Sequence, residues 1–435
     1  MMISDQEPVC VIQDNATLVS AVVQLEAAPY VAFDTEFIRE KTYYPLLCLL
    51  QLATDNQQMI IDPFADIDFQ LLKPVFCSPD VTKIVHSGAQ DLEILYRLLD
   101  APVNPVFDTQ IAAQLIGLPQ QIGLAAMVKH YTGTSLSKAD SFSDWARRPL
   151  TKTQLKYAVD DVLYLPKIYC LMNKELKRTG RSHWLDSEMA ELSSRERFEQ
   201  CPERLWRKLK GTANLNRRQL AVLRELAVWR DDSAAARDLP RKWLVSDEQL
   251  VDIARRMPID AEALYQTRGL RDRLNPSWRD GILGAVRAGK ALGEDELPER
   301  EKRGASSMFD HGCILNLMQA LVHLRGRENH VATNLLAPHA ELLRLAEGQR
   351  SNLSILQGWR GELIGQDLLG LLDGRLYLSL DRQMLKVTSV LPTTVGVFPD
   401  THTPSRSQTG HAPNNGVGVL DVQAAGSSEQ AVSTA

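Results

Sequence analysis

The sequence predicts an α/β domain with a mixed sheet, followed by two small all-helical domains and a tail that does not fold. Runs of strand-forming residues are confined to the first part of the chain. Further on, the apolar residues recur with helical spacing instead. The last stretch is rich in Thr, Ser, Gly, Pro and Asn and has too few apolar side chains to form a core. A length of 435 residues suits two or three domains.

Three strands open the first domain, which we place at residues 1–194. They read VAFDTEF, LLCLLQLAT and QMIIDPF, and the short polar turns between them are typical of an antiparallel meander. The next strands, KIVHSGA and VFDT, each run into a helix, AQDLEILYRLL and TQIAAQLIGL, so the sheet is predicted to be mixed. A later helix is predicted from about Lys152 to Leu165, because Pro149 and Thr151 are typical starting residues.

Helical periodicity predicts the two further domains. One amphipathic face begins at Leu250, after a capping box formed by Ser246 and Gln249, and another begins at Ile314. We expect these domains at residues 195–292 and 308–388, joined by a charged linker at 293–307. Residues 389–435 are expected to be a disordered tail.

The charge is distributed unevenly along the chain. Residues 1–194 carry 16 basic and 24 acidic side chains, a net −8, whereas residues 195–303 carry 24 and 19, a net +5. The six cysteines are scattered without a CxxC pair, which argues against a zinc site or a disulfide framework. The start, MMISDQEPVC, lacks the pattern of a secretory signal, and no apolar run is long enough to span a membrane. We therefore expect a cytoplasmic protein without a membrane partner.

Five residues are the candidates for chemistry. Asp34 and Glu36 are two apart on a predicted strand and so point to one face. Asp91 falls in the first turn of a helix, and Tyr157 precedes Asp161 by one helical turn. Four carboxylates and a phenol form an all-oxygen set that suits Mg²⁺ or Mn²⁺. Two such ions are the usual arrangement for in-line displacement at a phosphodiester.

Each of these residues also has a structural explanation when it is taken alone. Asp91 can complement the helix dipole, Asp161 can be a solvated helix residue, and Tyr157 can be half-buried packing. Asp34 can cap a turn at the end of a strand, but its apolar neighbours Val31, Ala32, Phe33 and Phe37 disfavour a solvated position. The occurrence of all five in this order favours the metal site.

The motifs DTE (34–36), HSGAQDL (86–92) and YAVDD (157–161) resemble the three motifs of the tyrosine branch of the DEDD exonucleases. The flanking stretches FDTEFIREKTYYPLLCLLQLA, FDTQIAAQLIG and SFSDWARRPLTKTQLKYAVDDVLYL are similar to the ribonuclease D family. This resemblance spans about residues 9–190. It implies a ribonuclease-H-like exonuclease fold that acts 3′ to 5′ on RNA, releases nucleoside 5′-monophosphates and trims transfer-RNA precursors and other small stable RNAs.

The resemblance also implies a role for each site residue. Asp34, Glu36 and Asp161 are expected to bind one divalent ion, with Asp34 bridging to a second. Asp91 is expected to hold that second ion through water. Tyr157 is expected to orient the attacking water, because a phenol with a pKa near 10 is a poor base at neutral pH.

The basic middle region resembles the helicase-and-RNase-D C-terminal (HRDC) domain, and residues 308–388 resemble a divergent second copy. Arginines on a polar helix face can bind RNA phosphates, and an exposed indole can stack on a base. The candidates for RNA binding are Arg217, Arg218, Arg241, Lys242 and Trp243. The alternative is a solvated charged face with the tryptophans in the core.

Two other functions remain open from the sequence. A proofreading-type DNA exonuclease uses the same two-metal chemistry, and no residue visibly selects the 2′-hydroxyl. A non-catalytic RNA-binding protein is disfavoured because every motif carboxylate is present. The expected partner is RNA with a free 3′ end, and the sequence indicates no stable protein partner.

Overall fold

The computed structural model describes residues 10–136, 143–199, 202–270, 274–299 and 311–389. All of these described residues belong to one compact unit. Apart from Ser389, the predicted disordered tail lies outside the described residues. No described helix has both the length and the apolar character needed to cross a bilayer.

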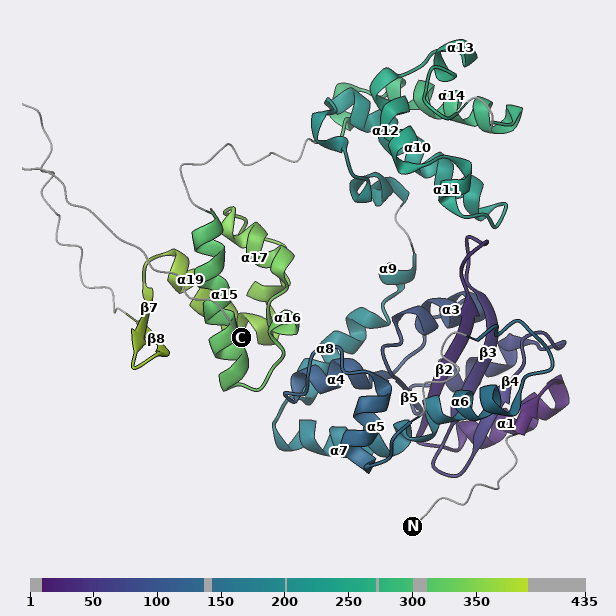
Figure 1. Cartoon of the computed structure of the whole chain (residues 1–435), viewed down its shortest axis with the longest axis vertical. Coiled ribbons are helices and arrows are strands. Elements are labelled where there is room, and N and C mark those ends of the chain that lie inside the picture. Colours follow the sequence, from purple (N-terminus) through teal and green to yellow (C-terminus); the bar gives the residue numbers. More distant parts are fainter. Residues whose placement is uncertain (1–9, 137–142, 200–201, 271–273, 300–310, 390–435) are drawn as a thin grey trace, which may run out of the picture. The chain divides into compact units, whose positions relative to one another are not determined.

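A six-stranded mixed sheet forms the centre of the first domain (Figure 1). Its strand order is β1-β4-β3-β2-β5-β6; β2, β3 and β4 pair antiparallel, and the other three pairings are parallel. The predicted mixed sheet and its antiparallel meander are therefore confirmed. The sequence analysis did not predict β1. The strands are β1 (Cys10–Ile12), β2 (Tyr30–Ile38), β3 (Leu46–Ala53), β4 (Gln58–Ile61), β5 (Thr82–Val85) and β6 (Val106–Asp108).

Helices cover both faces of this sheet. Because side chains alternate along β2, Phe33 points to one face of the sheet. There its ring packs edge-to-face against the ring of Phe76, with the two ring centroids 5.4 Å apart. Ala32 points to the other face and packs with Val162 of α6. The predicted helix at 152–165 ends at Leu163, and α7 follows with Pro166 in its first turn. The helices are α1 (Asn15–Glu26), α2 (Lys73–Phe76), α3 (Ala89–Leu99), α4 (Thr109–Leu115), α5 (Leu124–Thr132), α6 (Lys152–Leu163), α7 (Leu165–Arg178), α8 (Ser182–Leu192) and α9 (Arg195–Phe198).

The next domain is helical, as predicted. Its capping box is present, since the Ser246 N–H donates to Gln249 Oε1 at 2.9 Å and the Gln249 N–H donates to Ser246 Oγ at 3.3 Å. Leu250 and Ile253, which follow it, are fully buried in this domain's own core. The helices are α10 (Arg217–Ala235), α11 (Arg241–Leu244), α12 (Asp247–Arg256), α13 (Ala261–Leu264) and α14 (Pro276–Ala291).

The last described region is helical except for a β-hairpin at its end, which the prediction of an all-helical unit missed. The hairpin pairs β7 (Leu376–Asp381) with β8 (Met384–Ser389). Its turn residues Arg382 and Gln383 both have positive φ, 46° and 66°. Neither is a Gly or Asn, so the usual hairpin signal is missing from the sequence. The helices are α15 (His311–Glu328), α16 (Thr333–Leu336), α17 (His339–Ala346), α18 (Gly358–Arg360) and α19 (Gln366–Leu372).

Candidate active site

Three of the predicted carboxylates converge between β2 and α6. Asp34 and Glu36 project from β2 and Asp161 from α6, and ligand oxygens of all three lie within 4.8 Å of one another. All three residues are partly buried. The alternation of β2 places the first two on the sheet face that α6 covers. The structure therefore brings together residues more than a hundred positions apart, as the sequence predicts.

Helix α6 is fixed at its start and by its buried side. Thr151 and Gln154 form a capping box, in which the Thr151 N–H donates to Gln154 Oε1 at 3.0 Å and the Gln154 N–H to Thr151 Oγ1 at 3.1 Å. Ala158, fully buried, packs between the helix and the sheet. Because Tyr157 and Asp161 are four apart, they lie on one face of this anchored helix.

Asp91 lies beside the cluster and is held by the strand. One of its oxygens, Oδ1, accepts a hydrogen bond from the Thr35 N–H at 3.1 Å and another from the Thr35 hydroxyl. The three-residue group of converging oxygens does not include Asp91, but its charge acts on both Asp34 and Glu36. Asp91 is thus bound to β2 through its Oδ1.

The turn that delivers Asp91 is braced by Asp108 at the end of β6. This buried carboxylate accepts hydrogen bonds from the N–H groups of Ser87 at 3.1 Å, Gly88 at 2.9 Å and Gln110 at 2.8 Å. Ser87 has a positive φ of 60°. Asp108 therefore links the start of α3 to the start of α4. These hydrogen bonds give the aspartate of the FDTQ stretch a structural role.

The four carboxylates resist simultaneous ionisation. Burial raises the pKa of Asp34 well above its usual range, and the Asp91 carboxylate adds to this effect. Burial and the charge of Asp161 raise the pKa of Glu36 to about 8. Burial raises the pKa of Asp161 to about 7, with a contribution from Asp160, and that of Asp91 to about 6. Divalent cations relieve such repulsion and prefer carboxylate oxygens, so the donor set fits a metal site.

Tyr157 is neutral at physiological pH. Burial, followed by the charge of Asp161, raises the pKa of its phenol above the usual value. Its hydroxyl interacts with the Asp161 carboxylate one helical turn away. The neighbouring Asp160 pairs instead with Lys156 at 3.2 Å. A neutral hydroxyl can orient a water molecule but is a weak proton acceptor.

Gln51 is a further residue of the site that the sequence analysis missed. It lies on β3 directly opposite Asp34, so the two side chains share one face of the sheet. Gln51 is fully buried, and neither polar atom of its amide has a hydrogen-bond partner among the described residues. An unpaired buried amide is costly, so we expect a carboxylate or a water of the working site to pair with it. The sequence signal that could have identified Gln51 is its position as a single polar residue in the apolar run LLCLLQLA.

The predicted RNA-binding residues fall into two groups. Arg217 donates to the carbonyls of Glu294 and Leu297, both at 3.1 Å, and Arg218 binds carbonyls at the end of α14. Arg241 pairs with Asp231. These three arginines therefore make contacts within the chain. Lys242 and Trp243 are exposed, the tryptophan by 53%.

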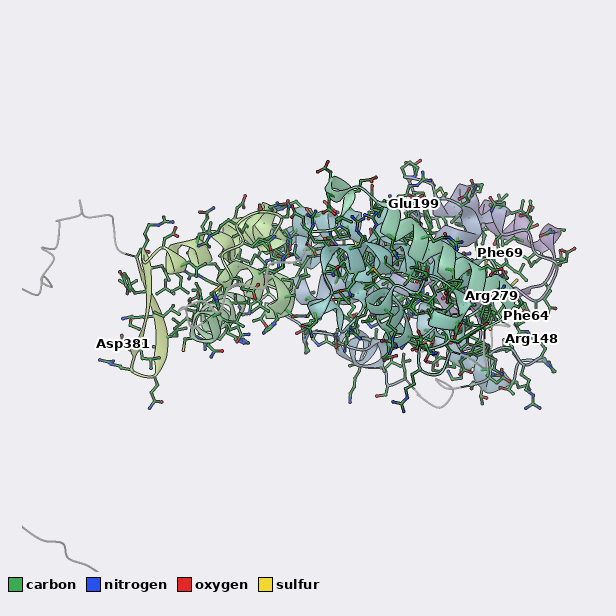
Figure 2. The ribbon with its side chains drawn as sticks, turned by 90° about the horizontal axis from the view of Figure 1, so that it is seen from above. Phe64, Phe69, Arg148, Glu199, Arg279 and Asp381 are labelled. Atoms are coloured by element: carbon green, nitrogen blue, oxygen red, sulfur yellow. The ribbon has the colours of Figure 1, made fainter. Side chains whose placement is uncertain are left out.

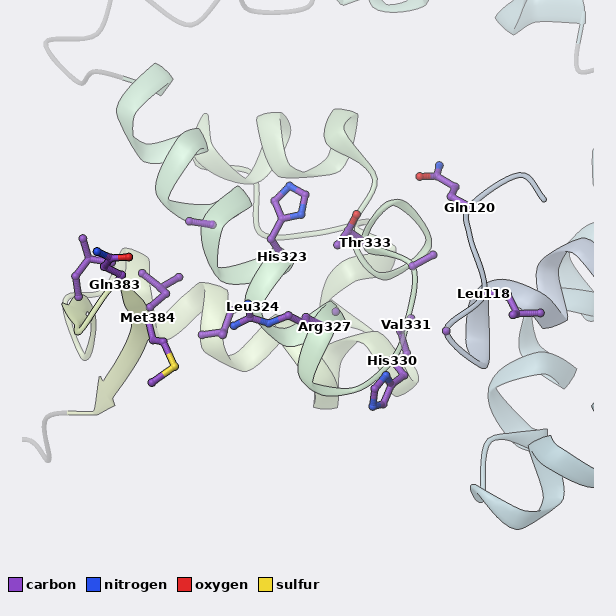
Figure 3. Close-up of a pocket in the computed structure, with 16 residues that line it drawn as sticks. Leu118, Gln120, His323, Leu324, Arg327, His330, Val331, Thr333, Gln383 and Met384 are labelled. Carbon is purple, nitrogen blue, oxygen red and sulfur yellow. The ribbon is translucent and has the colours of Figure 1, made fainter. Parts of the chain in front are cut away.

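Figure 3 shows a cavity of about 770 Å³. Its walls include His323 and Arg327 of α15, His330 in the loop that follows, and Met384 of β8. None of the predicted site residues lines it. This cavity and the candidate chemistry are therefore in different places.

Comparisons with known proteins identify the family of the chain. Residues 9–177 match the family model described as 3′-5′ exonuclease, and residues 219–275 match the HRDC domain. The chain is 39% identical over 384 residues to ribonuclease D of Sphingobium indicum, covering 87% of this chain and 98% of that one. It is 38% identical over 387 residues to ribonuclease D of Acidiphilium cryptum, covering 88% and 98%.

A solved structure agrees as well. The crystal structure of Escherichia coli RNase D, described as an exoribonuclease involved in structured RNA processing, is similar with a TM-score of 0.75 and 32% identity. The similarity covers 85% of this chain and 99% of that one. Since the relatives span the carboxylate cluster and the helical domains alike, the chain belongs to the ribonuclease D family and is a 3′ to 5′ exoribonuclease.

Proposed function

We propose that the carboxylate cluster binds two divalent cations, Mg²⁺ or Mn²⁺, and that the enzyme releases nucleoside 5′-monophosphates from the 3′ ends of transfer-RNA precursors and other small stable RNAs. The observation that carries this proposal is the convergence of Asp34, Glu36 and Asp161 within 4.8 Å. A place of action in the cytoplasm is part of the same proposal.

The proposal gives each carboxylate a task. Asp34, Glu36 and Asp161 would hold one cation, and Asp34 and Asp91 would hold the second. Thr35 keeps Asp91 in place for this. When bound, the pair of ions supplies positive charge to the scissile phosphate and acidifies the attacking water.

Tyr157 orients the attack in this proposal. Its phenol stays protonated, because burial and the Asp161 charge raise its pKa. The hydroxyl therefore holds the water in line with the phosphodiester and takes up no proton. The terminal nucleotide leaves with its 5′ phosphate, which is why mononucleotides are the expected product.

The decisive experiment is digestion of a 3′-extended transfer-RNA precursor, with and without a chelator, followed by identification of the products. We expect nucleoside 5′-monophosphates that appear only when divalent ions are present. Matched single-stranded DNA is digested in parallel. Equal or faster digestion of the DNA would favour the proofreading-type alternative, and binding without any product would favour the non-catalytic one.

The first HRDC-like domain is proposed to bind RNA through Lys242 and Trp243, which are both exposed. Arg217 is exposed as well, but its guanidinium donates to the carbonyls of Glu294 and Leu297. The double variant Lys242→Glu with Trp243→Ala is expected to raise KM for the precursor roughly three- to tenfold, because it removes an ammonium that can bind a phosphate and an indole on which a base can stack. The slope of log KM against the logarithm of the salt concentration should decrease by about one for each phosphate that the variant no longer binds. Steady-state kinetics at several salt concentrations measures both.

A matched control is Lys177→Glu, which reverses an exposed charge on α7. It should leave KM and its salt dependence near those of the unaltered enzyme. If the double variant behaves like this control, Lys242 and Trp243 do not bind RNA.

A further inference from the structure

Arg148 lies in the segment that precedes α6, and its guanidinium group forms hydrogen bonds only with acceptors of the same chain among the described residues. Nε donates to Asp62 Oδ2 at 2.8 Å, and Nη2 donates to Asp62 Oδ1 at 2.6 Å and to the Cys48 carbonyl at 2.8 Å. Nη1 donates to the carbonyls of Trp145 at 2.8 Å and Arg147 at 3.0 Å. A guanidinium has five N–H donors, so every one of them has an acceptor. Arg148 thereby ties its own segment to β3 and to the end of β4.

The surroundings make this contact stronger than a surface ion pair. The Asp62 side chain is only 6% exposed and that of Arg148 is 25% exposed. The hydrogen bonds from Arg148 hold the pKa of Asp62 below its usual value. The ring of Phe64 lies against the guanidinium, 4.7 Å from its carbon, and both residues are labelled in Figure 2. A lysine offers one compact ammonium and cannot reproduce this planar fork.

The segment that Arg148 anchors carries Trp145, which packs against Tyr157. The two ring centroids are 5.9 Å apart, and the rings are tilted by 42°. Trp145 is 4% exposed and shares a small core with Leu49 and Ala158. Its indole N–H has no hydrogen-bond partner among the described residues. The position of the ring therefore depends on packing and on its backbone, and Arg148 binds the carbonyl of that backbone.

We propose that Arg148 is a positioning residue of the active site. Held by Asp62, it fixes the backbone around Trp145, and the Trp145 ring in turn fixes the orientation of the Tyr157 phenol next to the carboxylates. This inference rests on the proposed role of Tyr157. An error of about 1 Å in the position of such a group is enough to cost on the order of 100-fold in rate.

A double-mutant cycle tests this inference on the full-length enzyme with the transfer-RNA precursor and saturating Mg²⁺. Tyr157→Phe is expected to lower kcat on the order of 100-fold. Arg148→Lys is expected to lower kcat about tenfold, while KM stays within about twofold, because RNA binding is untouched. In the Tyr157→Phe background, adding Arg148→Lys should change kcat by less than about twofold, since the hydroxyl that it positions is gone.

The control is Arg178→Lys, because Arg178 is an exposed arginine whose side chain is 73% accessible and pairs with Glu175. It should leave kcat and KM unchanged in either background. Thermal unfolding of each variant establishes that the folded enzyme is being assayed. If Arg148→Lys does not fold, Asp62→Asn takes its place in the cycle, because it weakens the same ion pair from the other side.

The outcomes are distinguishable. If the Arg148→Lys loss is equally large with and without the Tyr157 hydroxyl, Arg148 does not act through Tyr157 and the inference is overturned. If Tyr157→Phe alone leaves kcat unchanged, the proposed role of Tyr157 fails, and the inference that rests on it fails too. A rise in KM without a fall in kcat would also overturn the inference.

Discussion

Replacing Asp34 by asparagine is expected to lower the rate of mononucleotide release by at least ~10³-fold, because a ligand proposed to face both cations loses its charge. The side chain keeps its shape, and the cluster loses one of its mutually repelling charges. RNA binding is therefore expected to persist, and the metal-free variant should unfold at a higher temperature than the unaltered protein. Activity and stability thus move in opposite directions. Initial rates, equilibrium RNA binding and thermal unfolding measure the three effects.

Asp160→Asn is the matched control for this variant. Asp160 is next to Asp161 on α6, but its carboxylate pairs with Lys156 and is not among the converging oxygens. Its removal should change the rate by less than about threefold, an effect expected of a nearby surface charge. An undiminished rate in Asp34→Asn would exclude the carboxylate cluster as the place of hydrolysis.

Short-range periodicity explains why much of this site could be predicted from the sequence. Strand alternation put Asp34 and Glu36 on one face, and helical spacing put Tyr157 next to Asp161. Both patterns act over four residues or fewer, so neither depends on the tertiary structure. That these two elements meet was suggested by the motif order and by the family resemblance.

The parts that could not be predicted depend on register and long-range contact. Gln51 is opposite Asp34 only because of the pairing of β2 with β3, and a shift of one residue would turn it to the other face. The partner of Arg148 is 86 positions away in the sequence. Arg217 and Arg218 illustrate a different problem, because a guanidinium can donate to backbone carbonyls as well as to phosphates. Composition alone cannot tell which acceptor an arginine will meet.

Removing divalent cations is expected to abolish hydrolysis. It is also expected to make the free energy of unfolding decrease as the pH rises. Burial and neighbouring charges raise the pKa of Glu36 to about 8 and that of Asp161 to about 7, whereas the unfolded values are near 4. At pH values between the unfolded and the native pKa, the native state binds more protons than the unfolded state. The free energy of unfolding therefore falls as pH rises through this range. The metal-free protein should therefore lose stability from about pH 4.5 to about pH 8.

Added Mg²⁺ or Mn²⁺ should reverse this loss, because the cations replace the protons on the same oxygens. At pH 8 a concentration of about 100 times the dissociation constant is expected to raise Tm by roughly 5 to 10 °C. At pH 5 the shift should be much smaller, because protons compete for the carboxylates. Monovalent salt at matched ionic strength controls for screening, and Asp34→Asn should flatten the pH dependence. An equal cation effect at both pH values, or a metal-free stability that increases toward pH 8, would contradict a metal site built from these carboxylates.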